Sequence, residues 1–282
     1  MDAAVAPEDR TRALVRATFD AAAPHFDDPA LFFWDRLGRR TVELAAPAEG
    51  QRVLDVCCGT GASALPAARA VGPRGSVLGI DLSEGQLRRA RAKATGAGLD
   101  HVRFVTGDLE DLRLAPASAD LVVCVLGLYF ARDLSAAVAG LARPLRPGGT
   151  LAVTTWGRRS LEPGQSLYLD AVAAERPDLD LRTSTLSWAR IDTAAKLAGV
   201  FAGAGLPPPV VEEETVRRPV DADGFWRIVL GSGYRLMLDA MGGDAAERVR
   251  ADLDRRFRDA AVTEVVCDVL YARCTVAGAR GG

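Results

Sequence analysis

The sequence predicts a doubly wound α/β fold, in which helices cover both faces of a mostly parallel sheet. From about residue 50, strand-like and helix-like segments alternate along the chain, which is typical of parallel sheets. Residues 121–126 form a continuous apolar run, as expected of a strand buried on both faces. With 282 residues, of which 49% are hydrophobic, the chain is long enough to bury a full core.

Short apolar runs predict the strands of this core, and longer runs of helix formers predict its helices. The expected strands are residues 53–56, 76–80, 102–106, 121–126 and 150–155, and the expected helices are residues 62–71, 83–97 and 134–145. Gly72 and Pro73 end the first helix. Ser83, followed three positions later by Gln86, predicts a capping box at the start of the second helix.

The last third of the chain adds two strands and a helical insertion. A helix is expected from residue 191 to about residue 204, where Gly205 ends it. Residues 210–216 and 264–276 alternate or run apolar, so we expect two strands there. The segment between them is too long for a turn, and its glycines divide it into helices at about 221–241 and 244–260.

Composition and charge exclude several classes of function. The formal net charge of −2 offers no broad basic field for nucleic acid. The longest apolar run, residues 121–131, is too short to cross a bilayer, and the N-terminus lacks the apolar core of a signal peptide. Five cysteines without a Cys-x-x-Cys pair predict reduced thiols, and the two histidines lie too far apart in sequence to suggest a metal site. We therefore expect a cytoplasmic monomer or homodimer that handles a small molecule.

Two carboxylates near a glycine-rich turn are the most informative motif. A strand ending at Asp55 leads into Gly59-Thr-Gly61, and a second strand ends at Asp81. The glycines let the backbone approach a ligand closely, and the second acid can accept hydrogen bonds from both hydroxyls of a ribose. Because parallel strands bind ligands at their carboxyl ends, this pattern favours a nucleoside-containing cofactor.

This run of motifs resembles the class I S-adenosylmethionine-dependent methyltransferases. It is most similar to their small-molecule branch, which includes ubiquinone/menaquinone-biosynthesis enzymes and natural-product tailoring enzymes. The matching blocks are residues 53–61, 79–83, 107–109, 120–129 and 145–151, in the family's order and spacing. The resemblance implies a seven-stranded Rossmann-like sheet whose last two strands form an antiparallel hairpin, and S-adenosyl-L-methionine as cofactor.

The resemblance also implies roles for individual residues. Asp55 would orient the glycine loop against the methionine part of the cofactor, Asp81 would accept from the ribose, and Asp108 from the adenine amine. Leucines on either side would sandwich the adenine, and Cys58 would serve as a small packing residue. The complete expected set is Asp55, Cys57, Cys58, Gly59, Gly61, Asp81, Leu82, Gly107, Asp108, Leu109, Leu126 and Gly127.

Outside the core, we expect a helical cap that shapes the acceptor site. Residues 1–45 would form an N-terminal cover on a core domain of residues 46–282, with cap insertions at about 158–188 and 221–260. Within the cover, Phe19-Asp20 and Phe26-Asp27 resemble the Phe-Asp…Tyr-Asp element of the small-molecule branch, although Phe26 stands where tyrosine is usual. The expected substrate contacts are Phe26, Trp226, Tyr234 and Met237.

No acid–base dyad is evident in the sequence, and alternatives to methyl transfer stay open. Tyr129 and His25 are the candidate catalytic residues, and an acceptor that is already nucleophilic would need little more. Proteins of this fold can instead use the bound cofactor for cyclisation or decarboxylation. A third hypothesis is an NAD-dependent oxidoreductase, because the turn followed by Ala64 also fits a dinucleotide fingerprint. Against it, that pattern rarely carries an acid like Asp55, and no Tyr-x-x-x-Lys pair follows.

Overall fold

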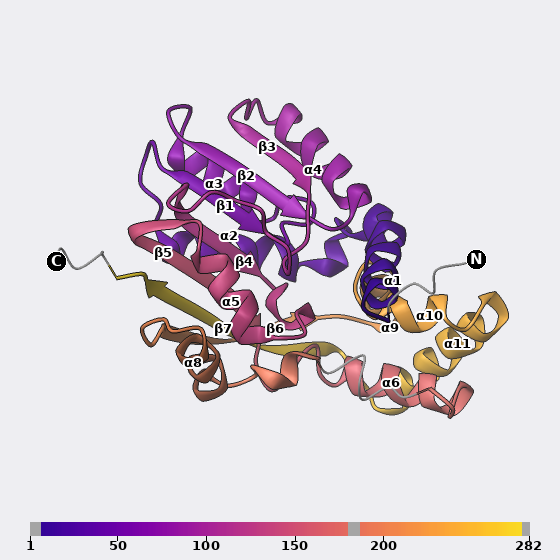
Figure 1. The fold of residues 1–282 in the computed structure, drawn as a ribbon. Coiled ribbons are helices and arrows are strands. Elements are labelled where there is room, and N and C mark those ends of the chain that lie inside the picture. The colour runs from indigo at the N-terminus through magenta and orange to yellow at the C-terminus, as the bar shows by residue number, and fades with distance from the viewer. Residues whose placement is uncertain (1–6, 180–186, 278–282) are drawn as a thin grey trace, which may run out of the picture.

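The computed structural model describes residues 7–179 and 187–277, which contain one seven-stranded sheet flanked by helices (Figure 1). The order of the strands is β3-β2-β1-β4-β5-β7-β6. The strands are β1 (Arg52–Val56), β2 (Ser76–Asp81), β3 (Val102–Thr106), β4 (Ala119–Val125), β5 (Leu145–Trp156), β6 (Val210–Pro219) and β7 (Glu264–Thr275). The first five are parallel, whereas β7 runs antiparallel between β5 and β6. The predicted fold class, including the C-terminal hairpin, is confirmed.

The register of the parallel strands brings the predicted acids to one edge of the sheet. Asp55 pairs with Gly79 on one side and with Val123 on the other. Asp81 is the last residue of β2 and pairs with Thr106, two residues before Asp108. Three strands therefore deliver a carboxylate to the same rim, as expected for the carboxyl ends of a parallel sheet.

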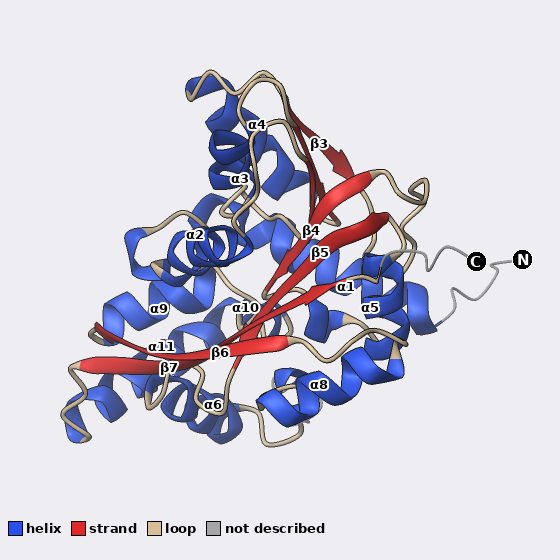
Figure 2. Ribbon diagram, turned by 90° about the vertical axis from the view of Figure 1, so that its left-hand side faces the viewer, coloured by secondary structure: helices blue, strands red, loops and turns tan. Residues whose placement is uncertain are grey.

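Neighbouring strand residues face opposite sides of the sheet and belong to two separate apolar cores. Val53 and Val123 pack with the helices α3 (Ala64–Val71) and α4 (Glu84–Gly96). Their neighbours along the strands face the other core, which includes residues of α5 (Leu134–Ala142) and α8 (Ala194–Gly203). This alternation follows from the two-residue period of a strand, and Figure 2 shows the helices on both sides of the sheet.

The remaining helices form a layer at the end of the sheet where β1 to β5 finish. They are α1 (Pro7–Ala22), η1 (Ala23–His25), η2 (Pro29–Leu31), η3 (Leu128–Phe130), α6 (Gly164–Glu175), η4 (Ser187–Arg190), α9 (Ala222–Leu230), α10 (Arg235–Asp239) and α11 (Gly243–Asp259). Helix α2 (Phe33–Ala45) instead packs beside α3 and against β4 and β5. Helices α1, α6, α9, α10 and α11 gather at one end of the molecule (Figure 1). The expected insertions at 158–188 and 221–260 fall in this layer, and residues 180–186 lie outside the described residues. Within the described ranges, none of the helices has both the length and the apolar character that a bilayer crossing requires.

One local prediction is confirmed and another needs correction. The glycines at 231 and 233 predict a break in the segment 221–241, and the structure divides it there into α9 and α10; a Cβ on Gly231 would come within 2.8 Å of the carbonyl oxygen of His25. The capping box at α4 is only half formed. Ser83 Oγ accepts from the backbone N–H of Gln86 at 3.1 Å, but the Gln86 side chain donates to the carbonyl of Phe19 at 3.3 Å. Gln86 thus connects the core helix to α1 instead of closing its own cap.

Candidate functional site

A cavity opens at the carboxyl ends of β1, β2 and β4 and beside the loop that follows β3. It has a volume of about 1190 Å³ when the space at its open mouth is included. The predicted cofactor residues that line it are Cys57, Cys58, Asp81, Leu82, Gly107, Asp108, Leu109, Leu126 and Gly127. The structure therefore brings together every predicted cofactor residue except Asp55, Gly59 and Gly61, which lie behind the cavity wall.

Asp55 lies beneath the glycine loop and is 1% exposed. Its Oδ2 accepts a hydrogen bond of 2.7 Å from Ser63 Oγ, while its Oδ1 has no partner among the described residues. Burial raises the pKa of Asp55 to about 7, the bond from Ser63 lowers it, and the charge of Asp81 raises it further. Asp55 is thus bonded to the residue that ends the glycine loop.

The loop between Asp55 and Ser63 contains three residues in the left-handed region of backbone space. Gly59 and Gly61 have φ values of +52° and +91°, and Cys57, which is not a glycine, has a φ of +60°. A Cβ on Gly59 would lie 3.3 Å from the ring of Phe26. Gly59 therefore faces the aromatic ring of the cover, which explains why it does not line the cavity.

Asp81 connects the glycine loop to the start of α4. Its Oδ2 accepts from the N–H of Gly59 at 2.8 Å, and its Oδ1 accepts from the N–H of Ser83 at 2.9 Å. Burial raises the pKa of this carboxyl, although the backbone N–H groups oppose the shift. Each carboxylate oxygen can accept two hydrogen bonds, so both oxygens retain capacity for the hydroxyls of a ribose in the cavity.

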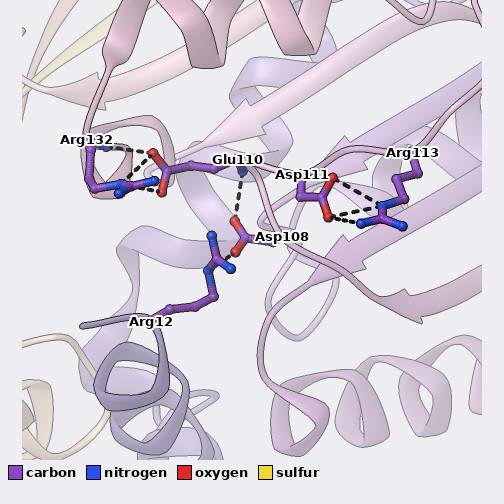
Figure 3. A network of polar contacts seen from close by, with 6 residues as sticks. All are labelled: Arg12, Asp108, Glu110, Asp111, Arg113 and Arg132. Carbon is purple, nitrogen blue, oxygen red and sulfur yellow. Dashed lines mark hydrogen bonds and ion pairs between the residues drawn. The ribbon is translucent and has the colours of Figure 1, made fainter. Parts of the chain in front are cut away.

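Asp108 belongs to a network of charged residues that closes one side of the cavity (Figure 3). Its Oδ1 accepts from the N–H of Glu110 at 2.8 Å, and its Oδ2 forms an ion pair with Arg12 of α1. Glu110 in turn forms an ion pair with Arg132, at 3.3 Å between Oε2 and Nε. The loop after β3 is therefore held between the cover and the segment after η3. We did not predict Arg12 or Arg132 from the sequence, because no spacing links them to the loop.

The wall at the end of β4 depends on close packing between two loops. Leu126 has a φ of +54°, in the same region as Cys57. A Cβ on Gly127 would lie 2.7 Å from Cys57 Sγ, a distance that real contacts do not allow. Glycine is therefore required at position 127 if Cys57 is to keep its place in the wall.

The cover is attached to the core by two aspartates. Asp20 Oδ1 accepts from Ser83 Oγ at 2.6 Å and from the N–H of Gly85 at 2.8 Å, so it caps the first turn of α4 from outside. Asp27 Oδ1 accepts from Thr60 Oγ1 at 2.6 Å. The sequence marks both acids as part of the Phe-Asp element, but not this tethering role.

A second cavity, of about 690 Å³ including its opening, lies beside the first. The two share the side chains of Val15, Phe19, Trp34 and Phe130 as a common wall, which we call the partition. The remaining lining residues of the second cavity are Thr18, Phe33, Tyr129, Trp156, Ser160, Leu161, Ser187, Trp188, Ser232, Gly233, Tyr234 and Leu236. Among the described residues, no charged side chain lines it.

The predicted acceptor residues divide between these cavities and the core. Tyr234 lines the second cavity, and Phe26 lines the first, with its ring stacked on Trp34 at 4.5 Å between centroids. Trp226 and Met237, expected to contact substrate, line neither cavity and are 8% and 4% exposed. Their helices place them in the apolar interior of the cap, so both expectations need correction.

The two candidate catalytic residues also differ in position. Tyr129 lines the second cavity, and burial raises the pKa of its hydroxyl far above the ordinary value, which keeps it neutral. His25 is exposed on η1 and lines neither cavity, so the structure does not bring it to a reacting atom. Over residues 7–179 and 187–277, no cluster of His, Cys, Asp and Glu side chains could hold a metal ion.

Comparison with known proteins places the first cavity within a recognised domain. Residues 53–149 match the family described as a methyltransferase domain. The segment contains the glycine loop, all three acids and the first residues of β5. The resemblance inferred from the sequence is confirmed.

Three curated relatives share part of this chain. The aklanonic acid methyltransferase DauC of Streptomyces sp. (strain C5) is 37% identical over 141 residues, which are 50% of this chain and 64% of that protein. The nocamycin O-methyltransferase of Saccharothrix syringae is 35% identical over 56% of this chain and 61% of its own length. A demethylmenaquinone methyltransferase of Listeria monocytogenes is 37% identical over a segment that makes up 40% of this chain and 48% of that protein. The chain thus spans less than two thirds of each relative.

A solved structure covers more of the chain. The crystal structure of the [4+2]-cyclase SpnF matches 86% of this chain and 81% of its own length, with a TM-score of 0.54 and 25% sequence identity. The match extends well beyond residues 53–149, so the similarity of fold includes part of the cap.

Proposed function

We propose that this protein is an S-adenosyl-L-methionine-dependent methyltransferase that methylates an oxygen, nitrogen or carbon atom of a small organic acceptor. The observation that carries the proposal is that Asp81 and Asp108, at the carboxyl ends of the neighbouring strands β2 and β3, line one cavity, with Asp55 of the adjacent strand β1 buried beneath the glycine loop. The family match of residues 53–149 supports the same conclusion. All five cysteines are free thiols, which favours a reducing, cytoplasmic location.

The residues present fit this cofactor. Asp81 has acceptor capacity left for the ribose, and Leu82 and Leu109 lie near it for the adenine ring. Asp108 would accept from the adenine amine, although it must share its carboxylate with Arg12. When bound, the cofactor supplies a methyl group on a positively charged sulfur.

The protein's own contribution is orientation and the exclusion of water. The apolar second cavity adjoins the cofactor cavity at the four side chains of the partition, so an acceptor held there would lie next to the cofactor. Correct placement of two reactants supplies about 7–11 kcal/mol in favourable cases. Because Tyr129 stays neutral and no histidine lines either cavity among the described residues, the acceptor must provide a nucleophilic atom without strong help from a base.

A second candidate function follows from the similarity to SpnF, whose title names a [4+2]-cyclase. A protein of similar fold can therefore catalyse a reaction other than methyl transfer. The same cavity would then serve to bind an apolar substrate in a folded shape.

Incubation with methyl-labelled S-adenosyl-L-methionine separates these candidates. The acceptors of the relatives, aklanonic acid and demethylmenaquinone, are suitable first substrates together with simple phenols and amines. Label in the product supports methyl transfer, whereas an unlabelled product of altered structure supports the second candidate. Saturable binding of NAD, without binding of S-adenosylhomocysteine, would overturn both and favour the oxidoreductase hypothesis.

A further inference from the structure

The second cavity contains polar atoms that the protein itself leaves unused. Thr18 is 3% exposed, and its Oγ1 has no hydrogen-bond partner among the described residues. The same holds for Nε1 of Trp34, which belongs to the partition. A buried polar atom without a partner costs free energy, so two such atoms in one cavity indicate a ligand that satisfies them.

The other hydroxyl groups of the cavity do not compete for this role. Tyr234 bonds through its hydroxyl to Gln165 Oε1 at 2.5 Å and accepts a hydrogen bond from Ser160. The hydroxyl of Tyr129 bonds to Trp156. Among the described residues that line this cavity, which include Ser187 and Ser232, Thr18 and Trp34 alone carry a buried polar atom without a partner, and both come from the N-terminal cover.

The rest of the cavity selects the chemical character of that ligand. Its aromatic side chains meet edge to face, as in Phe33 against Trp156 at 5.4 Å and Tyr129 against Trp188 at 6.2 Å. Flat aromatic rings fit between such edges and faces. A charged ligand would lose its hydration without a counter-charge, because the described lining carries none.

We propose, resting on the function proposed above, that the second cavity takes an uncharged aromatic acceptor and that Thr18 and Trp34 bind an oxygen atom on its ring. The indole N–H can only donate, so the acceptor must present a lone pair, as a phenol or a ketone does. The threonine hydroxyl can donate or accept, which allows it to bind the same oxygen. Thr18 and Trp34 are thus positioning residues that determine specificity.

Titration with a matched set of small probes tests this proposal. The probes are 1-naphthol, 1-naphthoate and 1-naphthylmethylammonium, measured by calorimetry with and without saturating S-adenosylhomocysteine. We expect 1-naphthol to bind at least about tenfold more tightly than either charged probe, because only the neutral one avoids burying an unpaired charge. Equal or tighter binding of a charged probe would overturn the proposed class of acceptor.

The anchoring residues are tested with a matched pair of threonines. Thr155 is also fully buried with an unpartnered hydroxyl, but it lines neither cavity. We expect Thr18→Val to weaken 1-naphthol binding about three- to tenfold, the worth of one hydrogen bond, and Thr155→Val to leave it unchanged. Trp34→Phe removes the other donor and should weaken binding to a similar degree. Unchanged affinity in both Thr18→Val and Trp34→Phe, or an equal loss in Thr155→Val, would refute the anchoring role.

Binding of S-adenosylhomocysteine to the unmodified protein distinguishes failure of this proposal from failure of the proposed function. If it binds but the naphthol pattern is absent, only the acceptor proposal falls. If it does not bind, the methyltransferase proposal falls, and the titrations made without it still decide what the second cavity prefers.

Discussion

The two cavities are adjacent, but they are built in opposite ways. The first is formed mainly by loops at the ends of parallel strands, and it contains acids whose oxygens bind backbone N–H groups and Arg12. The second is formed mainly by helices of the cover and cap, and aromatic rings make up much of its wall. Most of the first cavity is lined by residues 56–132, with part of the cover, whereas the second is assembled from more distant segments of the chain. A change in one is therefore expected to leave the other largely intact.

The largest expected effect is a loss of stability on substitution of Trp226, a tryptophan that lines neither cavity. Trp226→Ala should lower the free energy of unfolding by about 3–5 kcal/mol, as for other buried aromatic residues, without changing the relative affinities of the naphthyl probes. Trp188 is similarly buried, at 9% exposed against 8%, but lines the second cavity. Trp188→Ala should change those affinities. Denaturant unfolding and calorimetry measure the two effects, and altered probe selectivity in Trp226→Ala would contradict the assignment.

A smaller effect is expected on cofactor binding. Asp81→Ala should weaken the binding of S-adenosylhomocysteine by about 1.5–3 kcal/mol, the range for hydrogen bonds to a charged group. Asp100 is an exposed acid at a distance from both cavities, and Asp100→Ala serves as the control. Calorimetry that finds equal affinity in the two variants would rule out the ribose role.

The pH dependence of stability tests the burial of Asp55. Its pKa is raised to about 7 in the folded protein, above its value in the unfolded chain, so the folded state holds the proton more tightly. Stability should therefore fall as the pH rises from about 4 to 7, with a slope that approaches about 1.4 kcal/mol per pH unit. Asp55→Asn should remove this component, which parallel urea titrations of both proteins measure. Identical profiles would show that Asp55 ionises normally.

The smallest effect concerns the contact between the cover and the first cavity. Arg12 and Asp108 are partly exposed, so removing their ion pair should change binding by at most about 1 kcal/mol. Because the pair engages the carboxylate proposed to meet adenine, we expect Arg12→Gln to bind S-adenosylhomocysteine slightly more tightly. Arg16 is exposed on the same helix, and Arg16→Gln is the control. Weaker binding in Arg12→Gln alone would mean that Arg12 supports the cofactor.

The contrast between the cavities also explains which features the sequence could predict. Asp55, Asp81 and Asp108 each follow an apolar strand, so strand order alone places them together. The partition escaped prediction because Val15, Phe19, Trp34 and Phe130 come from three separate segments, and nothing in their spacing joins them. Trp226 and Met237 illustrate the opposite case, because the sequence suggested a contact with substrate that the structure does not show. An apolar residue on a helix faces the core more often than it faces a ligand.

The partition has a consequence for how such a protein can diversify. Within the part of the chain that the structure describes, four side chains line both cavities, whereas Leu161 and Ser232 line the second cavity and not the first. After gene duplication, one copy can accumulate changes at such positions and acquire a new acceptor while keeping the inherited adenosyl pocket. An engineer who wants a different product should begin with these residues and leave the partition unaltered.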